Sequence, residues 1–229
     1  MLIMTEIPFE TWKIIEKDPS IQLCLQRDLI NIRALSRFVA KQLEEKGLEP
    51  TEDAVISAIR RYPKDSTFKN KFENAGKIVS QSTISTRSHI VSIALETGKE
   101  AQETLPRLFS LINFERGETL RIVEGEESIK VLVDEKNLKK VLDLLPKRII
   151  IKIQEDLAEV NIHLHPEAVN TPGIVLVIST ELMLNSVNIY EIMSCVPEML
   201  VFVEEKDLMK AYQTLFELCH KKENNKTKK

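Results

Sequence analysis

Two stretches of this 229-residue chain repeat each other at a fixed distance. Residues 128–145, SIKVLVDEKNLKKVLDLL, align without a gap on residues 198–215, EMLVFVEEKDLMKAYQTL, and seven of the 18 positions are identical. Each copy has the pattern of an apolar strand followed by an amphipathic helix. A self-match at an offset of 70 residues indicates a duplicated structural unit.

The same offset, carried backwards, lays the strand pattern of residues 90–95 on residues 160–165, and a helix at 102–113 on one at 172–183. Each unit then has the order strand, helix, strand, strand, helix. RIIIKI (148–153) provides a closing strand for the first unit, but nothing equivalent follows the second helix. The second sheet must borrow an edge from the first unit or from another chain. Because an open edge invites pairing, we expect a homodimer.

The first 75 or so residues have helical patterns. Apolar spacings of three and four predict a helix over 31–46 that stops at Gly47. A second helix starts at Thr51, a good N-cap, and is ended by Pro63. A shorter helix over 19–27 precedes them, and Trp12 anchors a leading helix.

After Gly76 the pattern changes to period two, which predicts a strand over 78–84 and a second one in RSHIVSIALE. Three helices followed by a hairpin is the element order of a winged helix. We therefore expect an α+β protein with a helical, winged-helix-like domain over 1–86. Two modules over 87–155 and 156–221 and a disordered basic tail over 222–229 follow it.

Residues 160–218 resemble the C-terminal ACT domain of aspartokinases and of amino-acid-sensing regulators. The resemblance rests on the Thr171-Pro172-Gly173 turn into an apolar helix, on Val187-Asn188-Ile189 before the next strand, and on the strand and helix of the second repeat. It implies two tandem ferredoxin-like βαββα(β) ACT modules. The whole arrangement resembles archaeal regulator-like proteins with a winged helix before two ACT modules. No kinase-like nucleotide segment is present, so aspartokinase activity is not implied.

The turn into the second module's first helix has the chemistry of a small-molecule site. Gly173 permits close backbone approach, Pro172 suits a first helical turn, and the helix start offers N–H groups to a carboxylate. Asn170 and Asn188 add amides that donate and accept. A plain loop-to-helix junction is the alternative. The candidate ligand-binding residues are Asn170, Thr171, Pro172, Gly173, Ile174, Asn188, Ile189 and Tyr190.

The net charge of −3 hides a basic segment. Residues 58–87 contain seven Lys and Arg but two Asp and Glu. Such residues neutralise DNA phosphates, although Glu52 and Asp53 near the start of the third helix do not suit a polyanion. A protein-binding helical domain is the alternative. The candidate nucleic-acid-binding residues are Ser57, Arg60, Arg61, Lys64, Lys69, Lys71 and Lys77.

Other functional classes lack their signatures. There is no P-loop, GxGxxG, GxSxG or HExxH, so we expect no catalytic residues and no cofactor. His163 and His165 share a strand face, but no further ligand completes a metal site. The three cysteines have no CxxC spacing and suggest reduced core thiols. No apolar run reaches the roughly 18 residues of a membrane helix, and no signal peptide is evident, so we expect a cytoplasmic protein.

These observations favour an amino-acid-responsive transcription regulator that binds double-stranded DNA through its N-terminal domain. The alternative is a regulatory subunit that does not bind DNA and docks on an enzyme of amino-acid metabolism.

Overall fold

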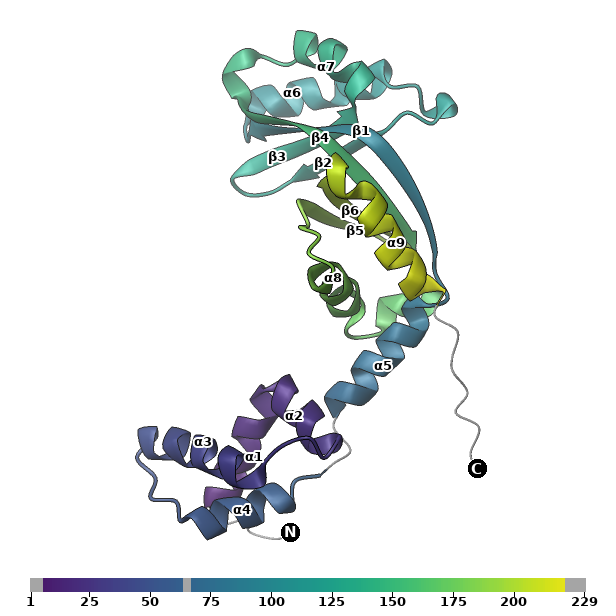
Figure 1. The fold of residues 1–229 in the computed structure, drawn as a ribbon. Helices are drawn as coiled ribbons and strands as arrows, with labels where there is room; N and C mark the ends of the chain where they lie inside the picture. The colour runs from purple at the N-terminus through teal and green to yellow at the C-terminus, as the bar shows by residue number, and fades with distance from the viewer. Residues whose placement is uncertain (1–5, 64–66, 221–229) are drawn as a thin grey trace. The chain divides into compact units, whose positions relative to one another are not determined.

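The computed structural model describes residues 6–63 and 67–220, and the chain divides into two compact units, residues 1–74 and 75–229. In the first unit, the described residues form a helical bundle (Figure 1). Its helices are α1 (Glu6–Lys17), α2 (Pro19–Gln26), α3 (Ile32–Glu45) and α4 (Glu52–Arg60). Helix α5 (Thr67–Val79) spans the boundary between the units.

Local signals in the sequence fix the ends of these helices. Side chains of Asp18, Asn31 and Thr51 accept backbone N–H groups at the starts of α2, α3 and α4, each cap stabilising its helix by about 1 kcal/mol. After α3, Gly47 has a φ of +79°, which favours glycine. The predicted helices over 19–27, 31–46 and 51–62 are confirmed, as is the leading helix of Trp12, whose Nε1 donates to the Ala58 carbonyl at 2.9 Å.

The second unit is an antiparallel sheet with helices. Its strands are β1 (Thr83–Glu96), β2 (Leu120–Glu124), β3 (Ser128–Asp134), β4 (Ile150–His163), β5 (Glu191–Cys195) and β6 (Glu198–Glu204). Its α-helices beyond α5 are α6 (Lys99–Leu108), α7 (Leu138–Leu144), α8 (Ile174–Leu184) and α9 (Leu208–Cys219). Short 3₁₀ segments, including η5 (Pro166–Asn170), lie between them. The mixed helix-and-sheet class is confirmed.

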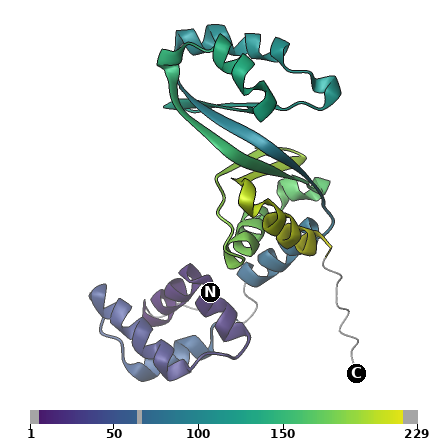
Figure 2. The same cartoon turned by 45° about the horizontal axis from the view of Figure 1, so that its top comes forward.

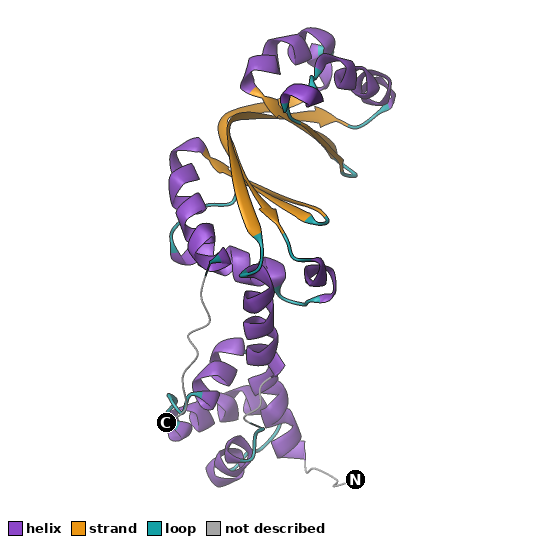
Figure 3. Ribbon diagram, turned by 90° about the vertical axis from the view of Figure 1, so that its right-hand side faces the viewer, coloured by secondary structure: helices purple, strands orange, loops and turns teal. Residues whose placement is uncertain are grey.

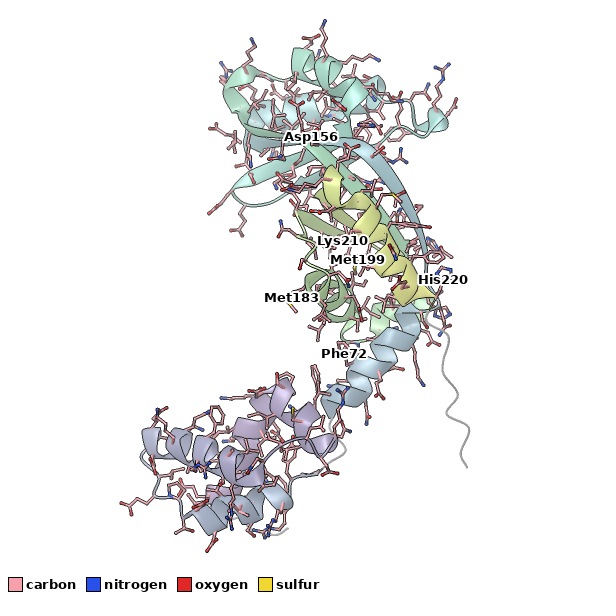
Figure 4. The ribbon with its side chains drawn as sticks, in the orientation of Figure 1. Phe72, Asp156, Met183, Met199, Lys210 and His220 are labelled. Carbon is pink, nitrogen blue, oxygen red and sulfur yellow. The ribbon has the colours of Figure 1, made fainter. Side chains whose placement is uncertain are left out.

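The strand order is β2-β3-β1-β4-β6-β5, and β1 and β4 hold the sheet together. These two long strands pair with each other along most of their length (Figure 2). Of β1, only residues 90–96 pair with β3. Of β4, only residues 157–163 pair with β6. Each long strand therefore contributes one part to each half of the sheet. His89 and Asp156, with φ of +57° and +56°, are the residues at which β1 and β4 pass from one half of the sheet to the other. Asp156 is labelled in Figure 4.

The sheet is strongly curved, with α6 and α7 outside one half and α9 outside the other (Figure 3). Lys130 of β3 and Glu191 of β5 form an ion pair at 2.7 Å although three strands lie between theirs. An apolar core lies on the inner side of the curved sheet, between its two halves. It consists of Ile90, Leu132, Leu157, Leu200 and Phe202.

The predicted hairpin over 78–95 is wrong. Residues 67–79 form helix α5, residues 83–96 form one strand, and no described residue before Thr83 lies in a strand. The apolar residues Phe68, Phe72, Ala75 and Val79 are three and four apart, and this helical period overrides the alternation that begins at Ile78. The wing of the expected winged helix is therefore missing from the described residues, and Lys71 and Lys77 lie on a helix.

Two further predictions about the sheet need correction. Residues 148–153 and 160–165 were expected to form separate strands, but β4 is continuous from 150 to 163. The offset of 70 residues also does not extend back to the strands that precede the two repeats, because β1 and β4 correspond at an offset of 67. Residues 83–87 of β1 pair with the C-terminal part of β4 and supply the strand that the second sequence repeat lacks. The borrowed edge is thus found within the same chain.

Candidate functional site

The loop between β4 and α8 is held by its own hydrogen bonds. His165 Nδ1 accepts the Glu167 N–H at 3.3 Å, and Thr171 Oγ1 donates to the Glu167 carbonyl at 2.8 Å. Leu164 N–H donates to the Pro197 carbonyl at 2.8 Å, which ties the loop to the β5–β6 turn. The loop therefore has a defined shape, set by short-range polar contacts.

Gly173 is the N-cap of α8. Its φ of +100° lies in the region that favours glycine, and no side chain caps the helix start. The first N–H groups of a helix have no partner within it, so those of Ile174, Val175 and Leu176 are available to an acceptor. Pro172 precedes the N-cap, so the predicted place of this proline in the first helical turn is wrong.

A cavity of about 470 Å³ opens at this helix start. Its walls come from the loop, from the first turn of α8 and from the β5–β6 turn, and Met199 of β6 is labelled in Figure 4. No lining residue is acidic, lysine or arginine; His165, Thr171 and Ser194 are the polar members. The apolar lining residues are Leu164, Ala168, Val169, Ile174, Val175, Leu176, Val196, Pro197 and Met199.

Three predicted ligand residues, Thr171, Gly173 and Ile174, line this cavity. Asn170 and Pro172 are exposed on the same loop but are not among its lining residues. The predicted loop therefore borders a cavity, but not every side chain named there lines it.

The other three predicted ligand residues lie elsewhere. Asn188 and Ile189 line a separate open hollow of about 640 Å³ beside Met183, which projects from α8 (Figure 4). Tyr190 packs against the apolar core on the inner side of the sheet, with Lys130 Nζ 5.3 Å from its ring centre. An eleven-residue helix is about 16 Å long, which separates these residues from the start of α8.

The β5–β6 turn was missed as a wall of the cavity. Its residues Ser194, Val196 and Pro197 lie there because Glu198 pairs with both His163 of β4 and Cys195 of β5. This register brings the turn beside the loop that follows β4. The first half of the sheet has only Thr97 and Gly98 between β1 and α6, so its corresponding loop is much shorter.

A second group of polar side chains surrounds the buried Glu159 on the inner side of the sheet. Glu159 is 3% exposed, and its Oε1 lies 3.5 Å from Arg121 Nη2. Arg87 is its partner in the β1–β4 register and lies 3.7 Å from Asp134. Glu159 Oε2, Arg87 Nε, Arg121 Nε and Thr119 Oγ1 have no hydrogen-bond partner among the described residues. Burial raises the pKa of Glu159, and Arg121 opposes this rise.

The candidate nucleic-acid residues are spread over two helices. Ser57 and Arg60 are exposed on α4, and Arg61 caps its end with Nε donating to the Ser57 carbonyl at 3.2 Å. Glu52 and Asp53 are exposed at the start of the same helix. Lys71 and Lys77 are exposed on α5, while Lys64 and the side chain of Lys69 lie outside the described residues.

Within residues 6–63 and 67–220, no three His, Cys, Asp or Glu side chains gather as metal ligands do. In the same ranges, no helix combines the length and apolar character that a bilayer crossing requires. Cys219 is buried, which raises the pKa of its thiol to about 11, but Cys195 is exposed on β5, so the core placement expected for that residue is wrong.

No protein-family model and no curated protein matches the sequence. Among solved structures, the chain is similar to an aspartate kinase from Clostridium acetobutylicum, with 22% identity and a TM-score of 0.48; the match covers 59% of this chain and 34% of that one. It is also similar to the ligand-free regulatory subunit of aspartate kinase from Thermus thermophilus (16%, TM-score 0.47, 60% and 98%). A third is E. coli aspartokinase III in complex with lysine and aspartate (17%, TM-score 0.43, 58% and 32%). The chain thus spans about a third of the two kinases.

Proposed function

We propose that this protein is a regulatory protein whose effector, a free amino acid, binds in the cavity at the start of α8. The observation that carries the proposal is the meeting of an uncapped helix start with an apolar cavity of about 470 Å³. The α-carboxylate suits the free N–H groups of α8, and the ammonium group suits carbonyl oxygens of the loop.

The lining favours an amino acid with an uncharged, apolar side chain. A charged side chain would lose its hydration in this cavity without gaining an ion partner from the walls, which is costly. An aliphatic or thioether side chain would instead bury apolar area against the lining. We therefore expect leucine, isoleucine, valine or methionine to bind more tightly than lysine or aspartate.

Thermal unfolding with each amino acid at millimolar concentration tests this proposal. A ligand at ten times its dissociation constant stabilises the folded state by about 1.4 kcal/mol, a shift of a few degrees. Val175→Trp should abolish the shift, because Val175 is 50% exposed and lines the cavity. Leu184→Trp is the matched control on the same helix, since Leu184 is 68% exposed and lines none of the described cavities.

The proposal fails if no amino acid shifts the parent, or if Val175→Trp responds as the parent does. A shift by lysine or aspartate with none by the apolar amino acids would keep the regulatory function but overturn the effector class.

We also propose that the two halves of the sheet are a duplicated pair of ACT modules. The last eight residues of β1 and of β4 share one burial pattern and start at His89 and Asp156, both with positive φ. Helices, strands and the 3₁₀ turns after β3 and β6 follow in the same order in each half. The modules are interlocked through β1 and β4.

In its finer form, the proposal is a transcription regulator that contacts double-stranded DNA through its helical unit and acts without catalysis. A docking subunit for a metabolic enzyme is the second candidate, and a cavity of about 260 Å³ in the helical unit favours it. Leu25, Ile30, Ile32 and Ile59 line it and could receive an apolar side chain of a protein partner. DNA affinity that falls steeply with salt supports the first form; no affinity at low salt supports the second.

A further inference from the structure

Helix α3 carries a row of exposed basic residues on one face. Arg33, Arg37 and Lys41 are exposed and follow each other at spacings of four, so they lie in one row along the helix. Residues 29–43 contain no Asp or Glu, and the row ends at the exposed Glu45, four residues after Lys41. None of the three forms an ion pair with a described residue, although Glu45 lies one helical turn after Lys41.

Elsewhere in the helical unit, basic side chains are paired or mixed with acids. The Nζ atoms of Lys13 and Lys46 each lie 2.7 Å from a carboxylate oxygen of Glu10. The hydrogen bond from Lys13, which has the larger effect, and that from Lys46 lower the pKa of Glu10 to about 2. Helix α4 opens with the exposed acids Glu52 and Asp53. Helix α3 thus carries a regular row of exposed basic side chains, and it is not the helix that the sequence pattern favoured.

The row of charges is accompanied by apolar side chains that face solvent. Ala34 is exposed, and Phe38 is 50% exposed although it is a large aromatic residue. Leu35, Val39 and Leu43 on the other side of α3 are buried in the core of the bundle. The helix is thus fixed by one face and presents Arg, Ala, Arg, Phe and Lys on the other.

The dimensions of an α-helix suit the major groove of DNA. At a rise of 1.5 Å per residue, Arg33 and Lys41 are about 12 Å apart along the axis. The major groove of B-DNA is about 12 Å wide and admits an α-helix, whereas that of A-form RNA is too narrow. Alanine and phenylalanine are side chains that contact the thymine methyl group there.

We propose that α3 is the helix that enters the major groove of duplex DNA. Arg33, Arg37 and Lys41 contact phosphates along the groove, and Ala34 and Phe38 face the base edges. This inference rests on the DNA-binding form of the proposed function but moves the contact surface from α4 to α3. Arg60 and Arg61 are then secondary.

The test measures binding of the full-length protein to a fluorescent mixed-sequence DNA duplex of about 30 base pairs, over a range of salt concentrations. The triple variant Arg33→Gln, Arg37→Gln, Lys41→Gln should bind about tenfold more weakly or worse at low salt. Its salt slope should fall by about 2.7, because each phosphate contact contributes about 0.9. The replaced side chains are exposed, so thermal unfolding should match the parent.

The matched control removes three exposed charges from the sheet unit: Arg107→Gln, Lys139→Gln and Lys140→Gln. It has the same net charge as the α3 variant and should bind DNA as the parent does. Phe38→Ala separates groove contact from general attraction, since it should weaken binding about fivefold or more without changing the salt slope.

Three results would overturn the inference in different ways. If the α3 variant binds as the parent does while Arg60→Gln with Arg61→Gln abolishes binding, α4 is the contact helix and the DNA-binding proposal stands. If the parent does not bind the duplex at low salt, the DNA-binding proposal itself fails. If poly-glutamate competes as well as the duplex at equal charge, the surface recognises acidic chains in general.

Discussion

Glu159 is a carboxyl group in the middle of a sheet, only 3% exposed, with one of its oxygens unpartnered among the described residues. Arg121 and Arg87 offset part of the cost of its charge, but burial is the larger influence and raises its pKa. The folded state therefore holds the Glu159 proton more tightly than the unfolded chain does. Between the unfolded pKa of 4.5 and the higher folded value, this group makes the fold less stable as pH rises.

Glu159→Gln removes this ionisation and keeps the shape of the side chain. The free energy of unfolding of the variant, relative to the parent, should increase as pH rises from about 4 to about 7. Chemical denaturation at a series of pH values measures it, with the exposed Glu124→Gln as the control. A difference that is flat with pH, or that decreases, would show that Arg121 and Arg87 fully compensate the buried charge.

Single residues differ in how well the sequence predicts their role. Gly173 was predictable because Pro-Gly before an apolar run is a local signal, and its φ of +100° agrees with that. Tyr190 was not, because its place depends on how far α8 extends and on the curvature of the sheet. Glu159 gave no signal, since an acid between two apolar residues of a strand usually faces solvent.

Elements with a long, regular pattern were predictable, and those with competing patterns were not. Helix α3 has five positions of the apolar pattern at helical spacing and was found to within one residue at each end. Helix α5 was missed because Gly76 looks like a break and because Ile78 to Ile84 happens to alternate. Neither signal outweighs the helical row of Phe68, Phe72, Ala75 and Val79.

A glycine substitution tests the corrected element. Gly76 lies inside α5, and no atom lies within 4 Å of the position where an added Cβ would stand. Gly76→Ala should therefore stabilise the protein by about 0.5–1 kcal/mol, as alanine does in a helix. Gly117→Ala should instead destabilise it, because Gly117 has a φ of +73°. Thermal unfolding compares them, and a destabilising Gly76→Ala would contradict the helix.

For the whole molecule, the sequence predicted that the second repeat must borrow a sheet edge, but not that β1 and β4 are continuous strands that each pair in both halves of the sheet. Two strands of 14 residues serve both halves, and each reads in the sequence as two short strands. The bends at His89 and Asp156 carry no glycine or proline that would reveal them. Pairing over such distances is decided by the packed sheet and leaves no local trace.

The homodimer remains a prediction, now for a different reason. The sheet still ends in two edges within the chain, β2 and β5, and the β5 edge lies beside the exposed apolar residues Val175 and Leu176 of α8. We expect two copies to associate through this edge. Light scattering at micromolar concentration should give dimer mass for the parent and monomer mass for Ile192→Lys.

Val123→Lys on the opposite edge, β2, is the matched control and should remain a dimer. If Val123→Lys dissociates the dimer and Ile192→Lys does not, the interface is at β2. A monomeric parent would end the dimer prediction.

The first residue of β1 lies beside the last residue of β4, although they are 80 positions apart in the sequence. Helix α5 is followed by residues 80–82 and then by Thr83, which pairs with His163. The two residues after His163 already line the cavity. The cavity therefore lies next to the end of β4 that pairs with the first residue of β1.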